Sequence, residues 1–391
     1  MLLGRCLCRI ITLVGLTLLW GQALVAQRTG RVHAERLALE AEVETFFRNN
    51  EYGAGLSDDY TLPGYRLRLN VDYAAPTRRA LHLRVGLSNL YYWGASLYPN
   101  APYYIDLPYW SDEGSGYSRF RLRPFVQASI QLHPSWELTL GSLHGGVAHR
   151  LIEPLYNPEL RLTADYETGI QLRHSSDRLS LDTWVDWRSF IFRRARHQEA
   201  FVAGARLDYD LLSTKGSALK LRAQTLWGHR GGIENIVPDT VHTWGNTALG
   251  LQYQYRRTGQ RRPLTFSAST YLLTYSQRGG HYTSESGLGA YTELGLSGRT
   301  WELGLSAWRG RGYMGFLSTP FVQSELLHSP RGHLYHPTST YLKVSVGYSL
   351  VERELYTLGC RAAMWMHPRG SSTMAEVYLS IRPRFVLLRG R

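Results

Sequence analysis

The sequence predicts an all-β protein, a transmembrane antiparallel β-barrel of about 16 strands (range about 14 to 18) with a short N-terminal helix. Three observations support this fold class. Apolar and polar side chains alternate along most of the chain, and tight turns alternate with long polar loops. After the N-terminal segment, no stretch of about 18 or more apolar residues, the length that a membrane helix needs, is found.

The alternation is clearest in residues 288–308. The first run places Leu288, Ala290, Thr292, Leu294 and Leu296 on one face, and Gly289, Tyr291, Glu293, Gly295 and Ser297 on the other. After Gly298 and Arg299 the pattern resumes, with Trp301, Leu303, Leu305 and Ala307 sharing one face. Two period-two runs about a two-residue turn indicate a β-hairpin.

Residues 1–26 are predicted to be a signal peptide. Arg5 and Arg9 form a basic start, an apolar core follows, and small residues lie near a cleavage site after Ala26. Cys6 and Cys8 would leave with this segment. Cys360 would then be the only cysteine, which excludes a disulfide framework.

Residues 27–48 are predicted to contain a short helix that is periplasmic or enters the barrel as a plug, because Leu39, Val43 and Phe46 recur near one helical face. The barrel is expected over residues 49–391. Alternation identifies about 15 strands between residues 66 and 387. Since bacterial barrels have an even strand number, a further strand is predicted between about residues 44 and 60.

The basic residues are almost all arginine: of 44 lysines and arginines, only Lys215, Lys220 and Lys343 are lysine. The formal net charge is +13. Guanidinium groups suit phosphate and carboxylate ligands, although genomic composition and solvated loops would give the same count. No basic helix or binding motif points to nucleic acid, so a nucleic-acid partner is not expected.

The polar faces of the strands would line the lumen and carry charge on one wall. Candidate lumen-lining, anion-selecting residues are Arg66, Arg68, Arg84, Arg119, Arg121, Arg123 and Arg222. Asp182, Asp186, Asp208 and Asp210 would supply counter-charges, and later strands place Gly250, Gly289, Gly295, Gly304 and Gly347 on a nearly smooth wall. Such ladders either line a water-filled pore or pair fully and brace a closed lumen.

A long loop after residue 88 is rich in aromatic side chains. Its candidate ligand-binding residues are Tyr91, Tyr92, Trp93, Tyr109 and Trp110, which could stack on sugar rings or pack on one another. The aromatic residues at strand ends, Trp136, Trp227, Trp301, Tyr255 and Tyr348, are expected to form the interfacial girdle of a membrane barrel.

No catalytic site, metal site or cofactor is predicted from the sequence. The densest polar group, His144, His149, Arg150 and Glu153, matches no zinc spacing and reads as an external loop in which Arg150 pairs with Glu153. No GxSxG elbow occurs, and Ser142 has no identifiable base. The prediction is therefore that the chain is not an enzyme.

The signal segment, the repeated hairpins, the aromatic strand ends and the final strand resemble the porin-like outer-membrane β-barrels of Gram-negative bacteria. The resemblance covers about residues 46–387 and departs at the end, since the chain closes on 388-LRGR-391 while Phe385 lies where a terminal aromatic is usual. It implies an integral protein of the outer membrane in contact with lipid and lipopolysaccharide.

Three functions follow as hypotheses, of which the third is an outer-membrane enzyme, for which no catalytic motif is found. The first is a porin-like channel for small hydrophilic solutes, anions among them, and the second is a non-catalytic barrel whose loops bind surface polysaccharide or a secretion or assembly partner. The expected ligand is a glycan or an anionic solute. The substrate, the openness of the lumen and the oligomeric state are left undecided by the sequence.

Overall fold

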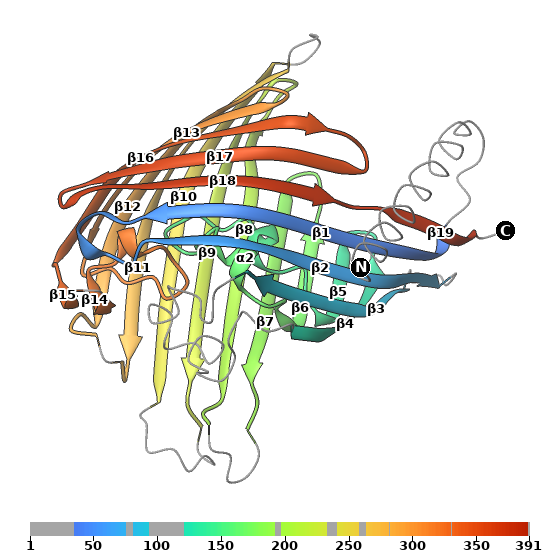
Figure 1. The fold of residues 1–391 in the computed structure, drawn as a ribbon, viewed down its shortest axis with the longest axis horizontal. Helices are drawn as coiled ribbons and strands as arrows, with labels where there is room; N and C mark the ends of the chain where they lie inside the picture. Colours follow the sequence, from blue (N-terminus) through green and yellow to red (C-terminus); the bar gives the residue numbers. More distant parts are fainter. Residues whose placement is uncertain are drawn as a thin grey trace, which may run out of the picture.

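The chain forms one closed antiparallel β-barrel in the computed structural model (Figure 1), which describes residues 35–75, 81–93, 121–191, 197–232, 241–257, 263–280, 282–329 and 331–389. The wall consists of β1 Glu35–Glu51, β2 Tyr60–Ala75, β3 Leu81–Tyr92, β4 Arg121–His133, β5 Trp136–Ser142, β6 Thr168–Ser175, β7 Leu179–Ser189, β8 Ala200–Ser213, β9 Ser217–Arg230, β10 His242–Arg257, β11 Leu264–Arg278, β12 Ser286–Ser297, β13 Trp301–Arg311, β16 Thr338–Glu352, β17 Tyr356–His367, β18 Gly370–Ile381 and β19 Arg384–Arg389. Outside the wall lie η1 Gly53–Gly55, η3 Gly146–His149, α2 Leu160–Thr163, η4 Pro320–Val322, β14 Glu325–Ser329 and β15 Gly332–Tyr335.

The sheet has 17 strand segments, of which β18 and β19 follow one another along β1 and share one place in the wall. The described barrel therefore has 16 strand positions, as the sequence predicts. It closes where β1 pairs with β2 on one side and with β18 and β19 on the other. Closure satisfies the backbone hydrogen bonds of every strand and leaves no open sheet edge.

The predicted N-terminal helix is wrong from residue 35 onward, because this segment is strand β1. Ala38 and Phe46 point inward and are buried, whereas Leu39 and Phe47 point outward and are exposed. The segment has both a helical and a strand periodicity. The strand forms because β1 closes the barrel by pairing with β2 on one side and with β18 on the other. The predicted extra strand is present but begins earlier than expected. The predicted signal peptide and residues 27–34 lie outside the described residues.

The two ends of the barrel differ. Tight turns such as Pro134-Ser135 join strands at one end, where the first and last strands also meet, with Glu35 opposite Arg389. The long connections leave from the other end, called here the long-loop end. In outer-membrane barrels the short turns face the periplasm and the long loops face outward. Among the described residues, no helix is long and apolar enough to cross a membrane.

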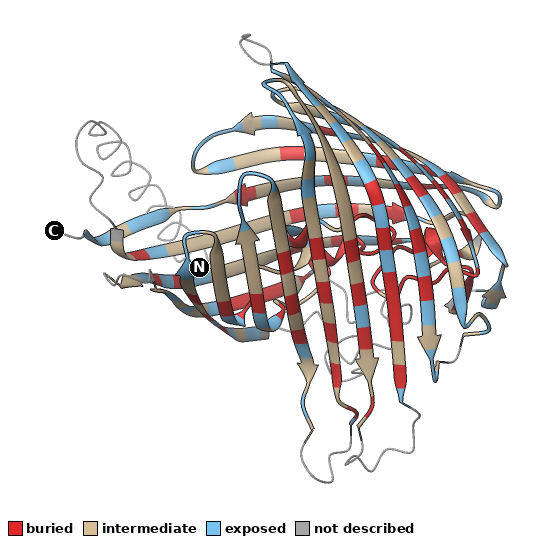
Figure 2. Ribbon diagram, turned by 180° about the vertical axis from the view of Figure 1, so that it is seen from behind, coloured by how far each residue is buried: buried red, intermediate tan, exposed pale blue. Residues whose placement is uncertain are grey.

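Buried and exposed residues alternate along the strands (Figure 2), and the exposed rows are apolar. They include Leu69, Val85, Val126, Leu140, Ile170, Leu249, Leu272, Leu303, Val344 and Val377. Leu272 is 73% exposed although it sits in the middle of β11. An apolar belt on the outside of a closed barrel is the surface that a lipid bilayer covers.

The glycine-rich inner wall is not smooth, contrary to the sequence prediction. A Cβ at Gly289 would lie 2.1 Å from the Trp308 ring, and one at Gly250 would lie 2.3 Å from the Tyr271 ring. Glycine at these positions therefore lets aromatic side chains of the neighbouring strands lie flat on the wall. These rings are buried because chain from two long loops packs against them.

Candidate functional site

Two segments that leave the long-loop end fold back into the barrel. These lumenal loops, residues 143–167 and 312–326, hold η3, α2 and η4 and are largely buried. They bind each other through backbone groups: Asn157 N–H donates to Leu317 O at 2.7 Å, and the Tyr313 hydroxyl donates to Pro154 O at 3.1 Å. The segment predicted as an external loop around His149 is therefore inside the lumen.

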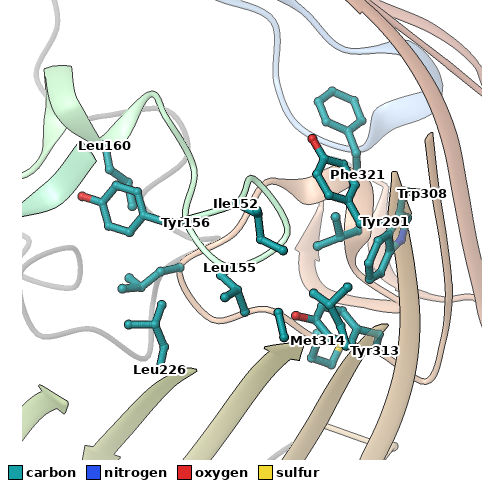
Figure 3. Packing of buried hydrophobic residues seen from close by; sticks show 14 of the residues in the cluster. Ile152, Leu155, Tyr156, Leu160, Leu226, Tyr291, Trp308, Tyr313, Met314 and Phe321 are labelled. Atoms are coloured by element: carbon teal, nitrogen blue, oxygen red, sulfur yellow. The ribbon is translucent and has the colours of Figure 1, made fainter. Parts of the chain in front are cut away.

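Apolar side chains of the lumenal loops pack against the inner wall (Figure 3). Leu155 lies between Leu226 of β9 and the Tyr313–Met314 segment, and Ile152 lies beside Leu155 on the side of Phe321. Phe321 stacks on Trp365 of β17 with ring centroids 4.6 Å apart. Leu155 is fully buried, so the loops and the wall share one hydrophobic core.

Buried carboxylates of the first lumenal loop are bound by basic groups of the wall. Glu153 pairs with Lys343 and accepts a hydrogen bond from the Trp365 indole at 3.2 Å, so it does not form the predicted pair with Arg150. Glu159 pairs with Arg48 at 2.7 Å and accepts from the Asn50 amide at 2.9 Å. Buried charges persist when they are paired in this way, and each pair fixes the loop to a particular strand.

His149 is held on both sides of its ring. Its Nδ1 is 2.8 Å from Asp182, its Nε2 is 2.7 Å from Glu167, and the ring stacks on Trp184 at 3.4 Å. Burial alone would lower its pKa, but the charge of Glu167 and the hydrogen bonds to both carboxylates outweigh it and raise the pKa to about 9. At neutral pH His149 is therefore a cation that anchors the loop, and it has no free nitrogen for proton transfer.

The predicted anion-selecting arginines lie on the inner wall, where the structure describes their side chains, and pair mostly with protein carboxylates and carbonyls. Arg68 contacts Glu42 at 2.7 Å, Arg84 contacts Asp72 at 3.6 Å, Arg123 contacts Asp165 at 3.0 Å, Arg222 contacts Asp208 at 2.8 Å, and Arg66 donates to the carbonyl of Arg161. Arg119 and the side chain of Arg121 lie outside the described residues. Arg66, Arg68 and Arg84 border a lumenal cavity of about 440 Å³, together with Arg161 and Glu167.

The predicted ligand-binding aromatics are not brought together as one site. Tyr92 is fully buried and donates to Leu162 O at 2.8 Å, so it supports a lumenal loop and cannot bind an external glycan. Tyr91 and Trp93 lie beside Tyr65, with ring centroids at 5.7 Å and 6.1 Å. Tyr109 and Trp110 lie outside the described residues.

A serine–histidine pair that the sequence analysis missed lies at the long-loop end. His367 Nε2, at the end of β17, is 3.2 Å from Ser372 Oγ on β18, and the Gly53 N–H donates to the same oxygen at 2.9 Å. The hairpin turn between β17 and β18 brings the two residues together. A second pair, His133 Nδ1 and Ser135 Oγ at 2.9 Å, lies in the β4–β5 turn at the opposite end.

A histidine within hydrogen-bond distance of a serine hydroxyl can accept its proton and make it a nucleophile toward an ester carbonyl. A histidine and a serine five residues apart across a turn are the signal that could have found His367 and Ser372, but this spacing belongs to no known catalytic motif, and the next strand was predicted to begin only at Ala375. Among the described residues, no group of three or more His, Cys, Asp or Glu side chains is arranged to hold a metal ion.

Solved structures of similar shape are outer-membrane proteins. A loop-deletion variant of OmpT from Vibrio cholerae has a TM-score of 0.49 and 8% identity, covering 89% of this chain and 100% of that one. OpdK from Pseudomonas aeruginosa has a TM-score of 0.45 and 11% identity, covering 90% and 100%. A variant of the porin of Rhodopseudomonas blastica has a TM-score of 0.44 and 12% identity, covering 89% and 100%. No curated protein matches the chain in sequence.

The porin-like barrel predicted from the sequence is confirmed, and the chain is an integral protein of the outer membrane. A family model described as lipid A 3'-O-deacylase-type matches residues 28–390. This is a family of enzymes, so the prediction that the chain is not an enzyme is wrong. With nearly the whole chain matched, the protein belongs to the lipid A 3'-O-deacylase-type family.

Proposed function

We propose that the protein is an outer-membrane hydrolase that removes an ester-linked acyl chain from lipid A. The observation that carries this proposal is the family match over residues 28–390, which spans the wall and both lumenal loops. Lipid A lies in the outer leaflet, and a barrel places its long-loop end at that leaflet. A site for this substrate therefore belongs at the long-loop end.

Ser372 and His367 supply the chemistry of ester hydrolysis at that end. His367 would accept the hydroxyl proton while Ser372 Oγ attacks the ester carbonyl, and would return the proton to the departing sugar hydroxyl. Water would then release the fatty acid from the acyl-serine. Ser372 is only 1% exposed and Gly53 lies over it, so substrate entry would require the η1 turn to move.

The test is acyl release from lipid A in vesicles that contain the refolded protein, with the released fatty acids identified by mass spectrometry. Wild type should release ester-linked chains and leave amide-linked chains in place. The Ser372→Ala variant should lose at least about a hundredfold in rate, as expected when a nucleophile is removed. The matched control is Ser135→Ala, which removes a histidine-bonded serine at the other end and should keep the wild-type rate. No release by wild type would refute the function, and full release by Ser372→Ala would refute the assignment of the nucleophile.

A channel for anionic solutes is the second candidate, and the arginine-bordered cavity of about 440 Å³ favours it. The lumenal loops weigh against it, because they fill space that an open pore needs and bind the wall charges of Arg48, Asp182 and Lys343. Stepwise conductance in planar bilayers at neutral pH would support the channel, whereas we expect the intact protein to be closed.

A further inference from the structure

The lipid-facing wall of the barrel contains a groove of about 310 Å³ across four neighbouring strands, β16, β17, β18 and β1. Two rows of side chains outline it: Asn49, Ala375, Ala362 and Val346 in one row, and Phe47, Val377, Cys360 and Tyr348 in the other. Its volume is at the lower end of the range of ligand pockets, about 300–1,000 Å³.

The groove exists because small side chains lie between large ones. Ala362 and Ala375 occupy its floor, while Phe47 and Tyr348 stand at its sides and are 57% and 47% exposed. Arg361 and Glu376 also border the groove, but their side chains pair with each other, and the rest of the lining is apolar apart from Asn49 and the Tyr348 hydroxyl. Such a surface has few groups that could bind a sugar or phosphate, so it suits an alkyl chain.

Polar side chains lie on the lipid-facing side at the β1 end of the groove. The Thr61 hydroxyl donates to Asn49 Oδ1 at 2.7 Å, and the Asn49 amide donates to Glu51 Oε1 at 3.2 Å. Glu51 and Thr61 are exposed at the long-loop ends of β1 and β2. A carboxylate facing lipid is tolerated at the level of the head groups, so these residues mark where the groove meets that layer.

The groove runs toward the serine–histidine pair. Ala375 is three residues after Ser372 on β18, a distance of about 10 Å along a strand. Thr373, next to Ser372, is the register partner of Glu51, which lies in the polar group just described. Ser372 faces the lumen and Ala375 faces the lipid, so the ester linkage of a chain in the groove would reach Ser372 by passing over the β17–β18 turn at the rim.

Two arginines add positive charge at the same rim. Arg369 lies in the β17–β18 turn, two residues after His367. The Arg331 side chain packs against Gly55 of η1: a Cβ atom added at Gly55 would lie 2.8 Å from it. Burial lowers the pKa of Arg369, and the charge of Arg331 lowers it further. Paired guanidinium groups complement the phosphates of an anionic lipid head group.

We propose that this groove binds one acyl chain of lipid A while Arg331 and Arg369 bind its anionic head group at the rim. The inference rests on the proposed function in naming lipid A, and it assigns the substrate a place on the outside of the barrel. The lumenal cavity then has no part in binding the chain. A phospholipid chain that fills the groove without preference is the alternative to be tested.

Cys360 provides a binding assay that does not depend on catalysis. In a chain carrying Cys6→Ser and Cys8→Ser, it is the only cysteine, and it lines the groove. The rate of Cys360 alkylation by N-ethylmaleimide would be measured in phosphatidylcholine vesicles with and without lipid A. We expect lipid A to slow the reaction at least about tenfold, as site occupancy by a bound ligand would. Equal rates in the two kinds of vesicle would overturn the proposal.

Groove-filling variants test the link to turnover. Ala362→Trp and Ala375→Trp should slow acyl release from lipid A at least about tenfold, because the chain loses its contact surface. The matched control is Ala307→Trp, an exposed alanine on the lipid face of the neighbouring strand β13 and outside the lining of the groove, which should keep the wild-type rate. All three variants should keep the folded band on unheated gels, which shows that they are folded. Normal lipid A turnover in both groove variants would also overturn the proposal.

The two proposals fail in different ways. If lipid A protects Cys360 but no fatty acid is released, the groove stands and the proposed hydrolysis falls. If fatty acid is released while Cys360 stays unprotected and the groove variants are fully active, the hydrolysis stands and the groove falls.

Discussion

The attachment of the first lumenal loop should weaken at alkaline pH, because His149 holds it as a cation. The pKa of His149 is raised from 6.5 to about 9 in the folded protein. At 1.36 kcal/mol per pKa unit, this corresponds to about 3 kcal/mol of stabilisation. A raised pKa means that the folded state binds the proton more tightly. The stabilisation is therefore complete below pH 6.5, declines between 6.5 and 9, and is lost above 9.

The assay is cleavage of the loop by subtilisin in refolded protein, normalised at each pH to cleavage of an unstructured peptide. We expect residues 143–167 to be resistant at pH 6 and to become at least about tenfold more sensitive at pH 10, since about 1.4 kcal/mol already changes an opening equilibrium tenfold. Bilayer conductance should rise over the same range if the loop leaves the lumen.

The His149→Ala variant should be cleaved readily at all pH values, because it leaves Asp182 and Glu167 buried without their cation, at a cost of about 3–5 kcal/mol. The matched control is His174→Ala, in which the replaced imidazole lies on β6 and does not contact the loop carboxylates. Equal protection of wild type at pH 6 and pH 10 would refute the reasoning.

Three further predictions concern the wall and its contents. Glu376→Gln removes the buried carboxylate that three arginines share, and should lower stability by about 3–5 kcal/mol, seen as a lower temperature for loss of the folded band on gels; an unchanged temperature would contradict the pairing. Gly289→Ala would place a methyl group 2.1 Å from the Trp308 ring and should lower the free energy of unfolding by about 1–3 kcal/mol, as measured by urea unfolding in lipid vesicles. Leu155→Ala should lower the free energy of loop opening by about 2–5 kcal/mol, seen as faster cleavage by subtilisin, because Leu155 is fully buried. Leu272→Ala on the lipid face should leave the loop resistant. Equal sensitivity of the last two variants would show that the lumenal core does not hold the loop.

The enzyme assignment illustrates where sequence reasoning stopped short. His367 and Ser372 are only five residues apart, but they form no known catalytic motif, and they meet because β17 and β18 pair in a particular register across a tight turn. His149, which was considered as a catalytic residue and set aside, has both nitrogens bound to carboxylates that come from outside its own turn. The family match, which overturns the non-enzyme prediction, uses the pattern of the whole chain.

The sequence by itself determined the barrel, a strand number of about 16 and the lipid-facing rows of the later strands, because the period-two alternation of residues such as Leu303 and Gly304 is a local property that one buried and one lipid-covered face impose. Only the tertiary structure decided that residues 35–51 close the barrel as β1, since the helical pattern there yields to two strands that need a partner. It also decided that the lumenal loops lie inside and that the groove beside Cys360 lies outside. Both depend on contacts between residues far apart in the chain, such as Glu153 with Lys343, and local periodicity carries no information about such contacts.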